Sequence, residues 1–258
     1  MSTNIWVISI NINGVNADRP GNTFSDLLDR FNKSKYHGML VQEPRYSTEA
    51  HSKSYNWETI AQLKKITCII SNNQQGVGGV ATFWKNSFTQ QTAEFSLTQV
   101  VEGEAQLTTF QFNMIRYSFC NIYADSHSGQ KRSTLFKKLK ELLPVYTFVA
   151  GDFNQVRDVN VDIWRVNGQN SLYDNTGWAS CTAMMQKLAI HDGWRDGPGQ
   201  QKLYFTKHTK QYGRTTCDWR PALACSLSSL EDTLGPMPAS LRAKLGAHTQ
   251  GACLPKAN

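Results

Sequence analysis

The sequence lacks the features of several protein classes. Its six cysteines form no Cys-x-x-Cys pair and no Cys/His metal spacing, which argues against a zinc site and favours free thiols. No apolar run reaches the roughly 20 residues that span a bilayer. No basic–apolar leader precedes the first strand pattern. We therefore expect an intracellular protein without a membrane partner.

Aromatic residues are absent from the C-terminal end of the chain. Every Phe, Trp and Tyr lies in residues 1–219, and none lies in residues 220–258. Because aromatic side chains dominate core packing, a segment without them contributes little to a core. The sequence thus predicts one domain over 1–219 and a non-homologous, poorly ordered tail over 220–258.

Acidic residues are outnumbered by basic ones. The chain has 27 Lys and Arg against 20 Asp and Glu, which gives a formal net charge of +7. This balance favours a polyanionic partner such as nucleic acid, although a basic surface without any partner has the same signature. Hydrophobic residues make up 40% of the 258 residues, which is enough for a sizeable globular core.

The chain contains a series of short strand patterns. Seven segments are rich in Val, Ile, Thr, Phe and Tyr: 5–10, 38–41, 68–71, 79–84, 106–112, 117–123 and 145–150. Three segments carry apolar residues at helical spacing instead: 23–31, 133–143 and 176–188. Many strands with few helices predict an α/β fold in which two sheets pack face to face with helices outside.

Several of these apolar strands end in polar residues. The residues in question are Asn11, Asn13, Glu43, Tyr123, Asp152 and Asn154. If the strands end at one edge, these side chains converge on one spot. Two carboxylates beside amides are ligands that suit Mg²⁺ or Mn²⁺. Each residue alone fits a capped turn or a solvated loop equally well, so the prediction depends on the whole set.

The motifs NING, VQE, GGVATFW, NIYA and GDFN resemble, in this order, those of the endonuclease/exonuclease/phosphatase superfamily, which has the DNase I-like fold. NINGVN followed by VQEP is most similar to the endonuclease domain of non-LTR (LINE-type) retrotransposons. The resemblance covers roughly residues 4–218 and is weaker after 155. It implies a four-layered α/β sandwich of two mixed sheets with flanking helices, and metal-dependent cleavage of phosphodiesters.

The resemblance also implies roles for individual residues. Asn11 and Asn13 match amides that help to hold metal-bound water and phosphate, and Glu43 matches the metal-ligating glutamate. Tyr123 matches the active-site tyrosine. Asp152 and Asn154 match the pair that orients the nucleophilic water and contacts the phosphate. A second metal ligand, Asp218, matches poorly because the preceding arginine, Arg214, is too far away in the sequence.

Two departures from the family pattern stand out. Asp125 occupies the position of the usual proline in NIYAD, where a carboxylate would repel substrate unless it points away. The family ends in Ser-Asp-His on its last strand, and this chain has no aspartate followed by histidine. The change of composition near residue 217 suggests that the last strands are incomplete. The missing Asp-His pair would remove two catalytic groups at once, which predicts weakened activity.

A basic segment, 130–140, lies on one predicted helix. Lys131, Arg132, Lys137 and Lys138 could contact phosphates outside the site, or they could form an ordinary solvated helix face.

Three functions therefore compete. The first is a Mg²⁺-dependent endonuclease that nicks DNA, a monomer without a small-molecule cofactor, which would act in the nucleus if its substrate is chromosomal. The second is a phosphatase of the same fold. The third is a catalytically inactive remnant that binds nucleic acid.

Overall fold

The structure is a computed structural model, and its described residues cover most of the predicted domain. They are residues 4–12, 24–44, 57–71, 78–155 and 174–190, with the backbone of three short strands at 163–164, 207–211 and 214–218. Asn13 and the predicted tail at 220–258 lie outside them.

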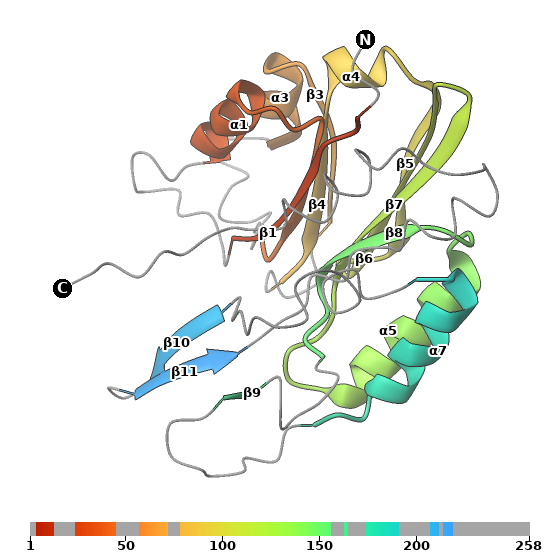
Figure 1. The fold of residues 1–258 in the computed structure, drawn as a ribbon. Coiled ribbons are helices and arrows are strands. Elements are labelled where there is room, and N and C mark those ends of the chain that lie inside the picture. The colour runs from red at the N-terminus through yellow and green to blue at the C-terminus, as the bar shows by residue number, and fades with distance from the viewer. Residues whose placement is uncertain are drawn as a thin grey trace.

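Two four-stranded sheets form the centre of the fold (Figure 1). The first has the order β1-β2-β4-β3, with β1 at Val7–Asn11, β2 at Gly38–Gln42, β4 at Val80–Lys85 and β3 at Ile66–Ser71. The second has the order β5-β6-β7-β8, with β5 at Ala93–Val101, β6 at Ala105–Phe112, β7 at Ile115–Tyr123 and β8 at Phe148–Asp152. Each is mixed, because β1–β2 and β7–β8 pair in parallel and the other pairs are antiparallel.

Helices cover the outer faces of both sheets (Figure 1). On the first sheet they are α1 (Phe24–Lys33) and α3 (Trp57–Leu63), and on the second they are α5 (Gly129–Leu142) and α7 (Trp178–Leu188). The short α4 (Asn86–Thr89) follows β4. This arrangement is the four-layered α/β sandwich that the motifs predicted. Within the described part of the chain, no helix is both long enough and apolar enough to cross a membrane.

A third, smaller sheet has the order β10-β11-β9, formed by Lys207–Gln211, Arg214–Asp218 and Ile163–Trp164. Its strands are antiparallel, and Asp218 pairs with Lys207 and Ile163. Only the backbone is described here, so the predicted metal-ligand role of Asp218 stays a prediction.

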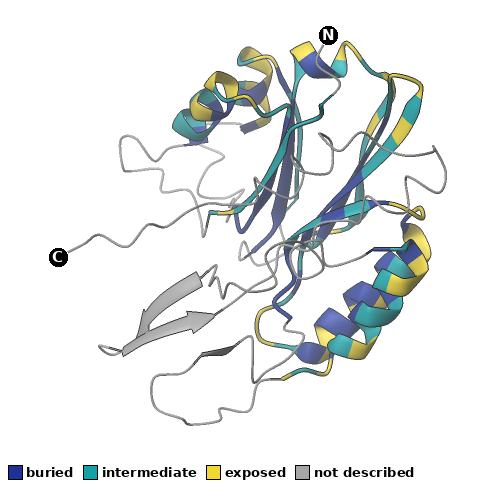
Figure 2. Cartoon of the chain, in the orientation of Figure 1, coloured by how far each residue is buried: buried dark blue, intermediate teal, exposed yellow. Residues whose placement is uncertain are grey.

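Buried side chains form one cluster in each gap between layers, and the sheet interiors and inward helix faces are buried (Figure 2). Phe24 and Leu28 of α1 join the cluster on the first sheet. Leu135 and Phe136 of α5 join the cluster on the second sheet. An aromatic cluster centred on Trp84 fills part of the space between the sheets. Apolar burial on this scale supplies most of the driving force for folding.

Several elements differ from the sequence-based expectation. Helices α3 and α4 and strands β9, β10 and β11 were not predicted, and α5 and β5 differ as well. Helix α5 begins at Gly129 rather than near Ser133, because the Ser128 side chain caps it by accepting a hydrogen bond from the Lys131 N–H. Strand β5 was not predicted. It is an edge strand with two register irregularities. Many of its side chains are exposed, so it contains polar residues and lacks the apolar pattern of a buried strand.

A polar layer also joins the two sheets. Asn121 of β7 is fully buried, and its amide donates to the carbonyls of Val41 (3.1 Å) and Ala81 (3.0 Å) and to the Thr82 hydroxyl (3.2 Å) on the opposite sheet. The Gln42 amide donates in return to Asn121 Oδ1 at 2.6 Å. Such a layer specifies the relative position of the sheets, because its groups are satisfied only in this register.

We expect Asn121→Ala to lower the free energy of unfolding by about 3 kcal/mol, because it leaves the Gln42 amide and two buried carbonyls without their partner. Urea denaturation measures this change. Asn32→Ala is the matched control, since its exposed amide makes one hydrogen bond to the Lys64 carbonyl. The role of the polar layer is disproved if the two substitutions cost the same.

Candidate active site

The carboxyl ends of β1, β2, β7 and β8 bring the predicted site residues together. Asn11 ends β1 opposite Gln42, the last residue of β2, so Glu43 follows directly beside it. Tyr123 ends β7 opposite Asp152, the last residue of β8. Parallel pairing forces each pair of strands to end at the same edge. Since the sheets face each other, residues from both sheets share this edge.

Asn11 bridges the two carboxylates. Its Nδ2 donates to Glu43 Oε1 at 2.9 Å and to Asp152 Oδ2 at 2.8 Å. The two acceptor oxygens are therefore at most about 6 Å apart. Both acidic residues are buried, with 8% of Glu43 and 5% of Asp152 exposed. The expectation that these carboxylates meet at one edge is thus fulfilled in the structure.

The bridge gives Asn11 a different task from the one that the motif implied. Both hydrogens of its amide are used by the two carboxylates, so in this conformation Asn11 orients acidic groups rather than a phosphate. Buried carboxylates this close repel each other when both are ionised. The amide lowers that repulsion only partly, because it adds hydrogen bonds but no positive charge.

Backbone geometry holds Asp152 against β7. Its Oδ1 accepts from the Asn154 N–H at 3.1 Å, and its carbonyl accepts from the Ala124 N–H at 2.8 Å. The preceding Gly151 has φ +144°, and a Cβ at that position would lie 2.0 Å from the Ile122 carbonyl oxygen. Only glycine permits this close approach of β8 to β7 at the point where the acid emerges.

Asn154 and Tyr123 lie beside this pair. The Asn154 amide donates to the Ala124 carbonyl at 2.7 Å, and the residue is held in a left-handed conformation with φ 44°. The half-buried Tyr123 ring packs against Gly78, where a Cβ would approach a ring carbon to 2.6 Å. Asn154 is thus engaged with the backbone, and its predicted phosphate contact stays a prediction.

The additional carboxylate of Asp125 is turned toward the start of α5. One oxygen accepts from the N–H groups of His127 and Ser128, and the other lies 3.4 Å from Lys131 Nζ. Burial alone would raise the pKa of this carboxyl, but the two backbone hydrogen bonds and Lys131 outweigh it, so its pKa lies below the ordinary value. The carboxylate is therefore already committed to structural partners.

The basic segment divides into two kinds of residue. Lys131, Lys137 and Lys138 are exposed on α5, as a phosphate contact requires. Arg132, by contrast, is only 2% exposed, and its guanidinium is hydrogen-bonded inside the protein. The expected nucleic-acid contact therefore does not fit Arg132. It remains a prediction for the three lysines.

The site offers donors that suit a hard divalent cation. Glu43 and Asp152 supply carboxylate oxygens at one edge, and the backbone N–H of Asn154 contacts one oxygen of Asp152. Mg²⁺ commonly uses one or two protein carboxylates and completes its shell with water and substrate phosphate. No cluster of three or more His, Cys, Asp or Glu forms among the described residues. The donor set fits a metal that is shared with the substrate rather than a closed protein cage.

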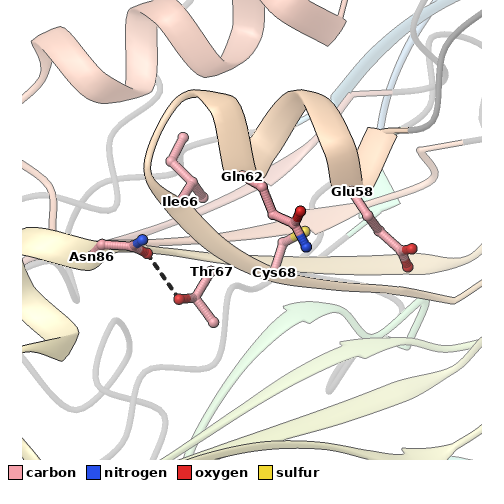
Figure 3. Close-up of a pocket in the computed structure, with 6 residues that line it drawn as sticks. All are labelled: Glu58, Gln62, Ile66, Thr67, Cys68 and Asn86. Atoms are coloured by element: carbon pink, nitrogen blue, oxygen red, sulfur yellow. Dashed lines mark hydrogen bonds between the residues drawn. The ribbon is translucent and has the colours of Figure 1, made fainter.

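A pocket of about 290 Å³ lies elsewhere, between α3, β3 and the start of α4 (Figure 3). Glu58, Gln62 and Cys68 are among its lining residues. Burial, with a smaller effect of Glu58, raises the pKa of the Cys68 thiol to about 12, so it stays protonated at neutral pH. The pocket contains none of the predicted site residues and no activated nucleophile.

Comparison with known proteins supports the fold. No protein-family model matches the chain, and no curated protein matches it by sequence. Solved structures do match. An AP endonuclease from Leishmania major has a TM-score of 0.63 at 15% identity, over 83% of this chain and 77% of that one.

Two further structures are similar over most of their length. An AP endonuclease from Archaeoglobus fulgidus has a TM-score of 0.54 at 12% identity, over 83% of this chain and 86% of that one. The endonuclease domain of TRAS1, a telomere-specific non-LTR retrotransposon, has a TM-score of 0.54 at 11% identity, over 88% of each chain. These similarities confirm the fold that the motifs predicted: the chain has the DNase I-like fold.

Proposed function

We propose that this protein is a metal-dependent phosphodiester hydrolase that nicks DNA, of the type found in non-LTR retrotransposons. The observation that carries the proposal is the Asn11 amide, which joins Glu43 from one sheet to Asp152 from the other at 2.9 and 2.8 Å. A pair of buried acids is costly to maintain in a folded protein, and a functional site is the usual reason for keeping one.

The residues of the site divide the chemical work. Asp152, whose carboxylate is oriented by Asn11 and by the Asn154 N–H, positions a water molecule for in-line attack and accepts its proton. Tyr123, at the end of the adjacent strand, offers a phenol as a hydrogen-bond donor to the phosphate. Asn11 keeps both carboxylates in place throughout.

Glu43, with Asp152, would hold Mg²⁺ or Mn²⁺, which when bound neutralises charge on the phosphate and on the leaving oxygen. The protein contributes a preformed edge where both acids are already buried and oriented. Preorganisation of this kind avoids the cost of assembling the site at the moment of reaction.

Two observations favour DNA as the substrate. The net charge of +7 and the exposed Lys131, Lys137 and Lys138 give the protein an attraction for a polyanion. The similar structures include AP endonucleases and a retrotransposon endonuclease domain. Contacts from the lysines would add affinity without base specificity.

A second candidate function is DNA binding without catalysis. The sequence has no aspartate followed by histidine, the pair that closes the active site in the family that the motifs resemble. If no other group replaces this pair, transition-state stabilisation is lost while the basic surface remains.

Nicking of supercoiled plasmid separates these functions. We expect the protein to produce open circles with Mg²⁺ and none after EDTA treatment. Glu43→Gln should abolish metal-dependent nicking, and Glu58→Gln, which changes an exposed glutamate of α3, should not. DNA retention without metal-dependent cleavage would favour the binding function. Release of phosphate from monoesters without nicking would favour a phosphatase.

A further inference from the structure

Arg132 is almost completely buried, which is unusual for an arginine in a basic helix. It has 2% exposure, whereas its neighbour Lys131 has a side chain that is 69% exposed. A buried guanidinium requires partners for its donors, because an unsatisfied buried charge is strongly destabilising. The identity of those partners indicates what the residue does.

The partners come from three separate segments. Nε donates to Gln155 Oε1 at 3.1 Å, and Nη1 donates to the Asp125 carbonyl at 3.0 Å. Nη2 donates to the Asp174 carbonyl and lies 3.9 Å from the Asp174 carboxylate. The planar fork of arginine therefore joins the segments that follow β7 and β8 to the segment that leads into α7.

Two of these segments carry the candidate active site. Asp125 comes two residues after Tyr123, and Gln155 comes directly after Asn154. The segments are further tied together by the Asn154 amide, which donates to the Ala124 carbonyl. Arg132 thus connects the two segments a second time, through Gln155 and the Asp125 carbonyl.

The surroundings of Gln155 leave little room for movement. Gln155 is 2% exposed, and its amide donates to Asn175 Oδ1. A Cβ on Gly177 would lie 2.6 Å from Gln155 Oε1 and 3.0 Å from Arg132 Cβ.

Asp174, the third partner of Arg132, is ionised at neutral pH. Hydrogen bonds from Thr176 and from the Gly129 N–H lower the pKa of its carboxyl group to about 2.

We propose that Arg132 is a positioning residue, which holds the segments after β7 and β8 so that Tyr123 and Asn154 stay aligned with Asp152. This inference rests on the proposed function for its catalytic consequence, but the geometry itself can be tested without cleavage. Arg132 touches no reacting atom and would act only through Gln155 and the Asp125 backbone.

The first test compares Arg132→Lys with Arg116→Lys, which changes an exposed arginine that pairs with Glu94. Lysine keeps the charge but lacks the fork, so Arg132→Lys should lower kcat by about 10- to 100-fold with little change in KM. Arg116→Lys should leave both unchanged. Assays run well below each variant's unfolding midpoint. Wild-type kcat in Arg132→Lys would overturn the proposal.

Gly177→Ala is a second variant that keeps the arginine and disturbs Gln155 from the other side. It should reproduce a fall in kcat at unchanged KM. Wild-type kcat in this variant, with Gln155 displaced in its structure, would count against a role for the Arg132–Gln155 contact.

Binding and exchange measurements separate this inference from its alternatives. With the charge-removing Arg132→Gln, the slope of log K against log salt should stay unchanged. A slope shallower by about 1, as expected for Lys137→Ala if that lysine contacts phosphate, would make Arg132 a phosphate contact.

Amide hydrogen exchange tests the positioning role directly. Exchange over residues 148–155 should be faster in Arg132→Lys than in the wild type, and unchanged in Arg116→Lys. Unchanged exchange would overturn the positioning role even if the wild type cleaves no DNA.

Discussion

Asp152→Asn should lower the plasmid-nicking rate by about a thousandfold. Asparagine has almost the same shape, so the buried site should remain packed. It carries no charge and is a poor base. It also has one accepting oxygen, whereas Asp152 uses one oxygen for Asn11 and the other for the Asn154 N–H. Rates of open-circle formation under single-turnover conditions measure the loss.

Asp29→Asn is the matched control for this substitution. Asp29 lies on α1 and pairs with Lys64, and its side chain is half exposed. We expect no change in nicking rate there. If Asp152→Asn retains more than a tenth of the wild-type rate while the control is unaffected, Asp152 neither activates the water nor holds the metal.

Gly151→Ala should lower the free energy of unfolding by about 3 kcal/mol or more, because it combines backbone strain with a steric clash. The backbone at φ +144° suits glycine, and the added methyl group would lie 2.0 Å from the Ile122 carbonyl oxygen. Relief of this overlap requires β8 to move away from β7, which would carry Asp152 with it. Urea denaturation reports the stability and the nicking assay reports the displacement.

Ala150→Gly in the same strand provides the comparison. It removes a methyl group instead of adding one, and should cost only about 1 kcal/mol through backbone entropy. Equal losses for the two variants would mean that β8 tolerates a side chain at 151, and that the close contact with β7 does not determine where Asp152 lies.

The sequence predicted that these side chains would come together because strand ends carry the information. Asn11, Glu43 and Asp152 each follow an apolar strand, and parallel pairing of β1 with β2 and of β7 with β8 brings those ends to one edge. The sequence could not predict that Asn11 would bridge the two acids. That contact depends on how two separately formed sheets dock, and no local pattern encodes the docking.

Arg132 was misassigned because it was grouped with neighbouring lysines by charge. The spacing of α5 contained a better signal, since Arg132, Leu135, Phe136 and Leu139 follow i, i+3, i+4 and i+7 and all four are buried. Helical periodicity therefore places the arginine on the core face. The polar partners that make this burial possible come from distant segments, and these were not visible in the sequence.

The division of the site between two sheets has a consequence for how the protein is made. The first sheet is complete at Lys85 and the second begins at Ala93, so Glu43 and Asp152 belong to successive halves of the chain. During synthesis, the amino-terminal half leaves the ribosome with its acid but without the opposing one. Asn11 can therefore join the two acids only when the halves dock. Under the proposed function, a nascent chain would neither hold a metal at this edge nor cut nucleic acid before that event.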